Sequence, residues 1–184
     1  MRLHSPWIHA LILFAVALPY FINLGASSIW DASEAFYAET PREMLESGDY
    51  LAPHFNYAPR TQKPPLVYWI VAASYKVFGV SEFALRLPGA LAACGILLFC
   101  YGIGRSLFNP RAALFAAIMA GTTARIFILA RRRPIDIFLI LFLTGTLFFL
   151  VRALRGGGTR GWVLAYLFAA LGFLAPGAAA EAAS

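Results

Sequence analysis

Long apolar runs alternate with short polar stretches along this chain. A membrane-spanning helix needs about 20 apolar residues, so the pattern predicts an all-α polytopic membrane protein with about 4–5 transmembrane helices. A signal peptide is the alternative for the first run, but its length of about 18 residues exceeds the roughly 7–15 of a signal-peptide core. The predicted spans are residues 7–24, 83–104, 112–130, 135–154 and 161–175.

The polar segment between the first two spans, about residues 25–82, is predicted to be an ordered outer loop with juxtamembrane helices. Residues 34–47 favour a short helix because acidic side chains gather near its N-terminal end and Gly48 suits its C-terminal end. Residues 65–79 form an apolar run that is short for a span. Its tyrosines and tryptophan are typical of the headgroup zone, so an interfacial or re-entrant helix is expected there.

Composition supports a membrane protein, because 60% of the residues are hydrophobic and only 13% are charged. A soluble domain is about 25% charged. The net charge of +6 reflects arginines at the span ends. The sequence has no basic stripe with interleaved aromatic residues, so the charge is poor evidence for nucleic-acid binding. The expected partners therefore include membrane lipids and no nucleic acid. Cys94 and Cys100 lie in an apolar run without zinc-site spacing, so no metal ligand is assigned.

The arginine distribution favours a cytoplasmic N-terminus by the positive-inside rule. The outer loop and the basic cluster Arg131–Arg133 then fall on the opposite side, which suggests that the cluster binds an anionic group. The opposite orientation would remove this anomaly but would place six other arginines outside. Those six are Arg2, Arg105, Arg111, Arg152, Arg155 and Arg160.

Six of the nine acidic side chains lie between Asp31 and Asp49, in the outer loop. A carboxylate at the membrane surface can accept a proton from an attacking hydroxyl group if it lies within hydrogen-bond reach. The alternative is a solvated helix whose acids favour its N-terminal end, with an i,i+3 pair between Glu39 and Arg42. Composition alone leaves both interpretations open.

Two further groups of residues are candidate binding sites. Asp136 stands just inside a predicted span, after Arg131–Arg133. An ionisable residue within a span is a functional candidate. Arginine is a natural partner for phosphate, so the three arginines are candidates for binding one. The alternative is a helix-end anchor. Lys63 precedes two prolines, which fix the chain direction and hold its amine where it can meet a lipid phosphate. Ordinary snorkelling of this lysine to the membrane surface is the alternative.

The order of several short motifs resembles that of the ArnT-like and protein O-mannosyltransferase-like membrane glycosyltransferases, the GT-C class. The resemblance extends from about Trp30 to residue 175. The residues that carry it are Ser33-Glu34, Tyr37-Ala38-Glu39, Arg42-Glu43-Met44-Leu45, Ser47-Gly48-Asp49-Tyr50, Pro53-His54, Gln62-Lys63-Pro64-Pro65, Tyr68-Trp69, Phe78-Gly79, Arg86 and Asp136.

This resemblance implies a GT-C-like helical bundle that transfers a sugar from a polyprenyl-phosphate donor to a lipid or protein acceptor. The site is expected on the non-cytoplasmic face of the inner membrane. Asp31 or Glu34 is then the catalytic base and Asp136 a second carboxylate. No cofactor is assigned, and a divalent metal stays open. The residues expected to bind substrate are Tyr37, Arg42, His54, Lys63, Arg131, Arg132 and Arg133.

Three departures from the family pattern accompany the resemblance. Ser33 stands where the family has aspartate, and serine cannot act as a general base at neutral pH. Gln62 replaces a glutamate, which removes a charge and any metal-ligand role. Ala175-Pro176-Gly177 replaces an expected lysine-glycine pair, and the family's members are much longer. The chain is therefore interpreted as an N-terminal part of such an enzyme, with an aberrant tail at residues 176–184.

The departures sustain two alternatives to an active enzyme. One is a non-catalytic membrane protein that binds lipid phosphates or forms part of a transporter, and the other is a truncated, inactive enzyme. Loss of the family's acidic groups at Ser33 and Gln62 favours these alternatives.

Overall fold

The computed structural model describes residues 6–29, 32–59, 63–132 and 134–175. The described residues are almost entirely helical, and the strands among them form one two-stranded hairpin, so the predicted all-α class is confirmed. In chain order the elements are α1 (Pro6–Ala17), the 3-10 helix η1 (Leu18–Tyr20), α2 (Ala32–Ser47), β1 (His54–Phe55), β2 (Ala58–Pro59), α3 (Leu66–Phe78), α4 (Glu82–Leu107), α5 (Pro110–Thr122), α6 (Ala124–Arg132), α7 (Pro134–Leu154) and α8 (Gly158–Phe173).

Two helices within the described ranges, α4 and α7, are long and apolar enough to cross a membrane. The bent pair α5 and α6 counts as a third span if it is taken as one unit. The first predicted span is shorter than expected, because α1 ends at Ala17 and the short 3-10 helix η1 that follows it ends at Tyr20. The hydroxyl of Tyr20 donates a hydrogen bond of 2.6 Å to the carbonyl of Gly121, which fixes this end against α5.

The sequence predicted one continuous span over residues 112–130, and the structure corrects this. The helix breaks at Thr123, whose backbone is extended, and α5 and α6 meet at an angle of 57°. The hydroxyl groups of Thr122 and Thr123 bond to carbonyls one turn earlier, at Ile118 and Met119. Such bonds compete with the helical ladder and bend helices, which a count of apolar residues cannot detect.

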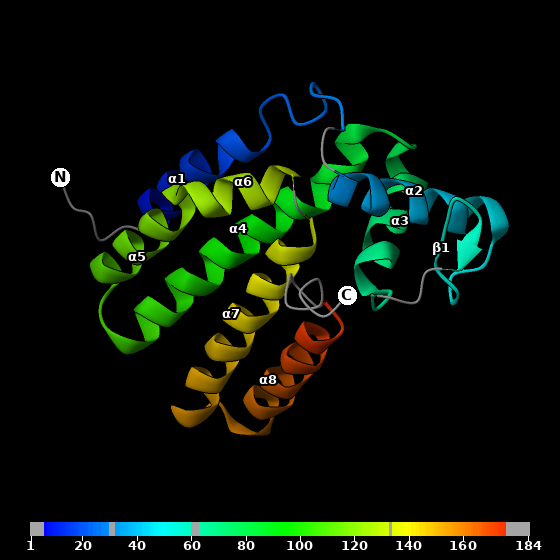
Figure 1. Cartoon of the computed structure of the whole chain (residues 1–184). Helices are drawn as coiled ribbons and strands as arrows, with labels where there is room; N and C mark the ends of the chain where they lie inside the picture. The colour runs from blue at the N-terminus through cyan, green and yellow to red at the C-terminus, as the bar shows by residue number, and fades with distance from the viewer. Residues whose placement is uncertain (1–5, 30–31, 60–62, 133, 176–184) are drawn as a thin grey trace.

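The centre of the fold is α4, which packs against α3, α5, α6 and α7 (Figure 1). Glycines allow close approach: a Cβ atom at Gly104 would lie 2.7 Å from the Cα of Ala113, and one at Gly89 would lie 2.8 Å from the carbonyl of Ala130. Such small-residue contacts are the usual means of helix packing in a membrane. On the other side of α4, four phenylalanine rings join α4, α7 and α8 with centroids 5.0–5.9 Å apart: Phe99, Phe148, Phe149 and Phe168.

The outer loop forms a second body of helices at one end of α4 (Figure 1). Here α2 packs on α3, close to the start of α4. The helix predicted over residues 34–47 is confirmed as α2, and Gly48 follows it with a φ of 74°, the left-handed conformation expected of a C-terminal glycine. The run 65–79 is confirmed as the short helix α3, which Gly79 separates from α4. The loop is therefore attached directly to the end of a span.

Candidate active site

A buried ion pair between Glu34 of α2 and Arg86 of α4 organises the junction of the loop with the bundle. Arg86 Nε donates to Glu34 Oε1 at 2.7 Å, and both residues are only 3% exposed. The other guanidinium nitrogens donate to the segment that follows the first helix. Nη1 reaches the carbonyls of Leu24 at 3.0 Å and Ser27 at 2.7 Å, and Nη2 reaches the carbonyl of Ser28 at 3.3 Å. Arg86 therefore joins three parts of the chain.

This pairing bears on the predicted role of Glu34 as a base. A general base must come within hydrogen-bond reach of the proton that it takes. The Glu34 carboxylate is instead buried and bonded to a cation, an arrangement that suits the positioning of α2 against α4. Its catalytic role stays a prediction. The other candidate base, Asp31, lies outside the described residues.

Sequence reasoning included Arg86 in the family resemblance but gave it no role. Its signal was available, because Arg86 lies in a predominantly apolar segment within the first two turns of a span. An ionisable residue in such a segment is expensive unless it is paired, so a carboxylate partner could have been expected.

The basic cluster stands at the end of α6, where Arg131 is bound to the turn after the first helix. Its Nη1 donates to the carbonyls of Pro19 at 3.0 Å and Ile22 at 2.6 Å, and the guanidinium lies 5.4 Å from the ring centre of Phe127. Arg132 is exposed, and Arg133 lies outside the described residues. The phosphate-binding role predicted for these arginines stays a prediction, with Arg131 already engaged by backbone oxygens.

Several candidate residues share one end of the bundle. Arg86 and Arg131 hold neighbouring parts of the same segment, residues 19–28, and Gly89 of α4 contacts the backbone of α6 at Ala130. Asp136, half-buried in the first turn of α7, follows Arg131 by five residues. Glu34, Arg131 and Asp136 therefore lie on three helices, α2, α6 and α7, that each pack against α4. No three acidic, histidine or cysteine side chains within the described ranges are grouped to hold a metal ion.

Lys63 is buried at 8% exposure, immediately before the two prolines that lead into α3. Tyr37 is also buried, and its ring stacks on Tyr68 of α3 with centroids 5.4 Å apart. Both residues thus belong to the packed body of the loop. Their contacts with substrate stay a prediction.

Arg42 forms a surface network on α2 that agrees with the i,i+3 pair anticipated as an alternative. Its Nε donates to Glu39 Oε2 at 3.0 Å, and its Nη1 forms an ion pair with Glu46. The hydrogen bond from Arg42 lowers the pKa of Glu39, and Glu39 in turn raises the pKa of Arg42. In this structure the guanidinium that was expected to bind substrate is paired with two carboxylates, those of Glu39 and Glu46.

His54 lies in a different place from the other candidates. It lines a cavity of 340 Å³ near the C-terminal end of α2, together with Glu43, Glu46, Ser47 and Tyr57. Glu43 is 3% exposed and accepts hydrogen bonds of 3.2 and 3.3 Å from the Tyr57 backbone. Glu43 follows Glu34 by nine residues, or about 14 Å along a helix. The structure therefore separates His54 from the junction that contains Glu34.

Replacing Arg131 with glutamine should lower the free energy of unfolding by about 1–3 kcal/mol, because hydrogen bonds from a charged donor to the first-helix turn are lost. Thermal unfolding of the purified chain in detergent measures this effect. Arg132→Gln is the matched control, because Arg132 is exposed and its loss should leave the melting temperature unchanged. Equal melting temperatures for the two variants would show that Arg131 does not hold this turn.

Comparisons with known proteins agree with this architecture. Residues 62–180 match the model of the family described as dolichyl-phosphate-mannose-protein mannosyltransferase. A curated relative from Pseudomonas fluorescens, named undecaprenyl phosphate-alpha-4-amino-4-deoxy-L-arabinose arabinosyl transferase 2, is 34% identical over 161 residues, which are 87% of this chain and 28% of that protein. An uncharacterised protein from Aquifex aeolicus is 36% identical over 118 residues, which are 64% of this chain and 24% of that protein.

Solved structures of ArnT from Cupriavidus metallidurans show the same fold. The apo structure matches with a TM-score of 0.84 and 26% identity, over 94% of this chain and 33% of that one. The structure bound to undecaprenyl phosphate matches with a TM-score of 0.84 and 25% identity, over 97% and 34%. The chain thus spans about a third or less of the length of these relatives. Their fold confirms the predicted helical membrane protein of the GT-C type, and the chain belongs to the dolichyl-phosphate-mannose-protein mannosyltransferase family.

Proposed function

We propose that this chain supplies the first part of a membrane glycosyltransferase that transfers a sugar from a polyprenyl-phosphate donor to a lipid or protein acceptor. The supporting observation is the match of 97% of the chain to a structure of ArnT bound to undecaprenyl phosphate. Curated relatives are named for transfer of an amino-deoxy-arabinose from undecaprenyl phosphate, so a pentosyl group is the first sugar to test.

In the proposed mechanism, cationic side chains bind the lipid phosphate and a carboxylate accepts the proton of the acceptor. Lys63 and Arg132, the exposed arginine among the described residues of the basic cluster, stabilise the charge that develops on the departing lipid phosphate, as preorganised cations do in transferase sites. Asp136 or Asp31 accepts the proton of the acceptor. Glu34 acts as a positioning residue, because its carboxylate accepts a hydrogen bond from Arg86 and so fixes the start of α2 against α4.

The site is proposed to face the non-cytoplasmic side of the inner membrane. This assignment rests on the arginine distribution, which favours a cytoplasmic N-terminus and places the outer loop across the membrane. Cysteine labelling of an exposed loop position such as Leu51 in intact cells would test it. Labelling only after cell lysis would contradict it.

Transfer is best tested in a chimera in which this chain replaces the matching segment of the Pseudomonas fluorescens arabinosyl transferase. The chimera and the chain alone would be reconstituted in vesicles with radiolabelled polyprenyl-phosphate sugars. Transfer by the folded chimera, abolished by Asp136→Asn or by Asp31→Asn, is the expected result. A monodisperse chimera that binds undecaprenyl phosphate without transfer would refute the catalytic assignment.

A lipid-phosphate-binding protein without catalysis is the second candidate, favoured by the serine at position 33 where the family has aspartate. The substitution Ser33→Asp separates the two functions in the same chimera. If the unmodified chimera binds the lipid but transfers no sugar, and Ser33→Asp restores transfer, the natural chain is a binder. Equal transfer by both forms would remove the binding-only alternative.

A further inference from the structure

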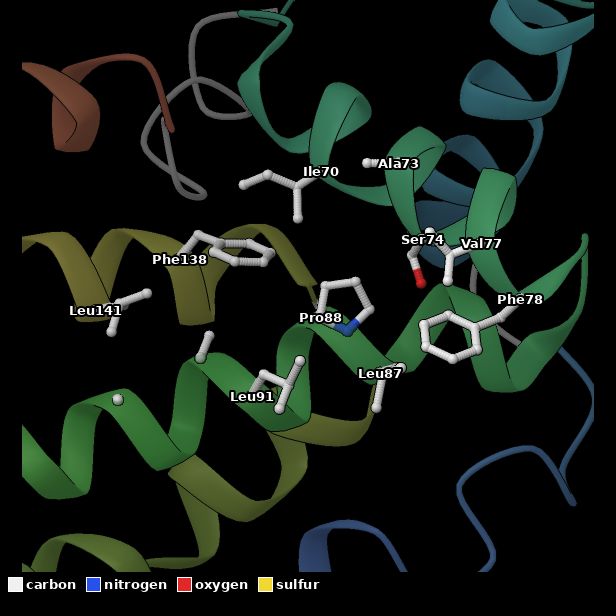
Figure 2. Close-up of a pocket in the computed structure, with 12 residues that line it drawn as sticks. Ile70, Ala73, Ser74, Val77, Phe78, Leu87, Pro88, Leu91, Phe138 and Leu141 are labelled. Atoms are coloured by element: carbon white, nitrogen blue, oxygen red, sulfur yellow. The ribbon is translucent and has the colours of Figure 1, made fainter.

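A large apolar cavity lies between α3, α4 and α7, and neither Lys63 nor Asp136 is among the residues that line it. Its volume is 460 Å³, and its walls are aliphatic and aromatic except for Ser74, whose hydroxyl already donates to the carbonyl of Ala84 at 2.6 Å. Figure 2 shows side chains from three helices around it, among them Ile70 of α3, Pro88 of α4 and Phe138 of α7. Such a space favours an apolar chain over a polar ligand.

A second, smaller cavity of 300 Å³ adjoins the first along α3, since Ala73 lines both. Its walls include Tyr50, Trp69 and Lys76. The indole nitrogen of Trp69 donates to the carbonyl of Tyr50 at 2.7 Å, which fixes the ring in place. The ammonium group of Lys76 is exposed, and within the described part of the chain no carboxylate forms an ion pair with it. This second cavity thus combines one cation with a rigid aromatic wall.

The positions of the two cavities relative to the membrane match the two ends of a lipid. Only three residues separate the end of α3 from the start of α4, so Lys76 lies at the membrane surface. The apolar cavity reaches Gly95, thirteen residues into α4, which is about 20 Å along the helix and well into a hydrocarbon core of ~30 Å. Tyrosine, tryptophan and lysine are typical of the headgroup zone above such a core.

This position also distinguishes the occupant from the proposed sugar donor. Lys63 precedes α3 and Lys76 lies in its last turn, so Pro64, Pro65 and about 15 Å of helix separate their backbones. A phosphate on Lys76 is therefore a different phosphate from the one assigned to Lys63. The rim residues Val77, Phe78 and Leu91 are exposed in this chain, so an acyl chain can enter the cavity between them.

We propose that the two adjoining cavities bind one anionic phospholipid of the surrounding leaflet, with its phosphate at Lys76 and an acyl chain between α3, α4 and α7. The bound lipid would hold α3 at its depth in the membrane. This binding does not depend on sugar transfer.

Native mass spectrometry of the purified 184-residue chain tests the proposal, with phosphatidylglycerol and phosphatidylcholine offered at equal concentration. The wild-type chain should retain one phosphatidylglycerol with about fivefold preference, the effect expected of one lysine near an anionic headgroup. Lys76→Gln should remove the preference. Ala73→Phe should reduce retention of both lipids, because the larger side chain fills the groove from an exposed position.

Arg105→Gln is the matched control, since this exposed arginine lies at the opposite end of α4. It should leave the preference unchanged. An equal loss in Arg105→Gln, or no change in Lys76→Gln, would overturn the site. Displacement of phosphatidylglycerol by an equal concentration of undecaprenyl phosphate, in the wild type and not in Lys76→Gln, would overturn the phospholipid as occupant and assign the groove to the donor.

Discussion

Replacing Arg86 with leucine should lower the free energy of unfolding by about 3–5 kcal/mol, the usual effect of removing one partner from a buried ion pair. The Glu34 carboxylate would remain buried without its cation, and the carbonyls of Leu24, Ser27 and Ser28 would lose their donor. Thermal unfolding in detergent measures the loss. Limited proteolysis after residue 24 should report the release of the segment that Arg86 holds.

Two further variants separate the ion pair from the rest of the site. In the double variant Glu34→Leu with Arg86→Leu no charge is left unpaired, so it should recover part of the stability lost by Arg86→Leu alone. Arg105→Leu removes an exposed cation from the same helix and should have little effect. If Arg86→Leu and Arg105→Leu melted at the same temperature, the ion pair would not be a determinant of this junction.

Lys63→Ala in an active chimera should lower kcat by about 10²–10³-fold, the effect of removing one preorganised electrostatic contact from a transition state. The expectation rests on the proposed function, because the amine of Lys63 would face charge that develops only as the sugar leaves the phosphate. Steady-state kinetics with a polyprenyl-phosphate sugar provide the measurement. Lys63→Arg keeps the charge and should recover part of the rate.

The comparison variant is Arg105→Ala, which removes an exposed cation far from the outer loop and should leave kcat unchanged. Circular dichroism and size-exclusion profiles would establish that Lys63→Ala keeps its fold. A folded Lys63→Ala chimera with the kcat of the parent would exclude Lys63 from stabilising the leaving phosphate.

Local patterns in the sequence were sufficient for most helices of the fold. Acids near one end and glycine at the other marked α2, and the apolar run with interfacial aromatic residues marked α3. The bend at Thr123 was missed because hydropathy measures how apolar a segment is and carries no information on its direction. The two threonine hydroxyls that bond to the preceding turn leave the hydropathy of the run almost unchanged.

The candidate site was harder to predict because its contacts join distant parts of the chain. Glu34 and Arg86 are 52 residues apart, and Arg131 bonds to Pro19 across 112 residues, so neither pair has a local signal. His54 was expected, with Lys63, among the residues that bind substrate. Folding instead places it in a cavity with Glu43 and Tyr57 at the far end of α2.

The separation of 52 residues between Glu34 and Arg86 also sets an order of events during synthesis. Translation proceeds at roughly 5–20 residues per second, so Glu34 leaves the ribosome about 3–10 s before its partner. Throughout that interval its carboxylate has no cation from α4 and must stay hydrated. The outer loop can therefore close only after α4 has been delivered to the membrane, and a nascent chain arrested before Arg86 would present the loop in an open, protease-sensitive form.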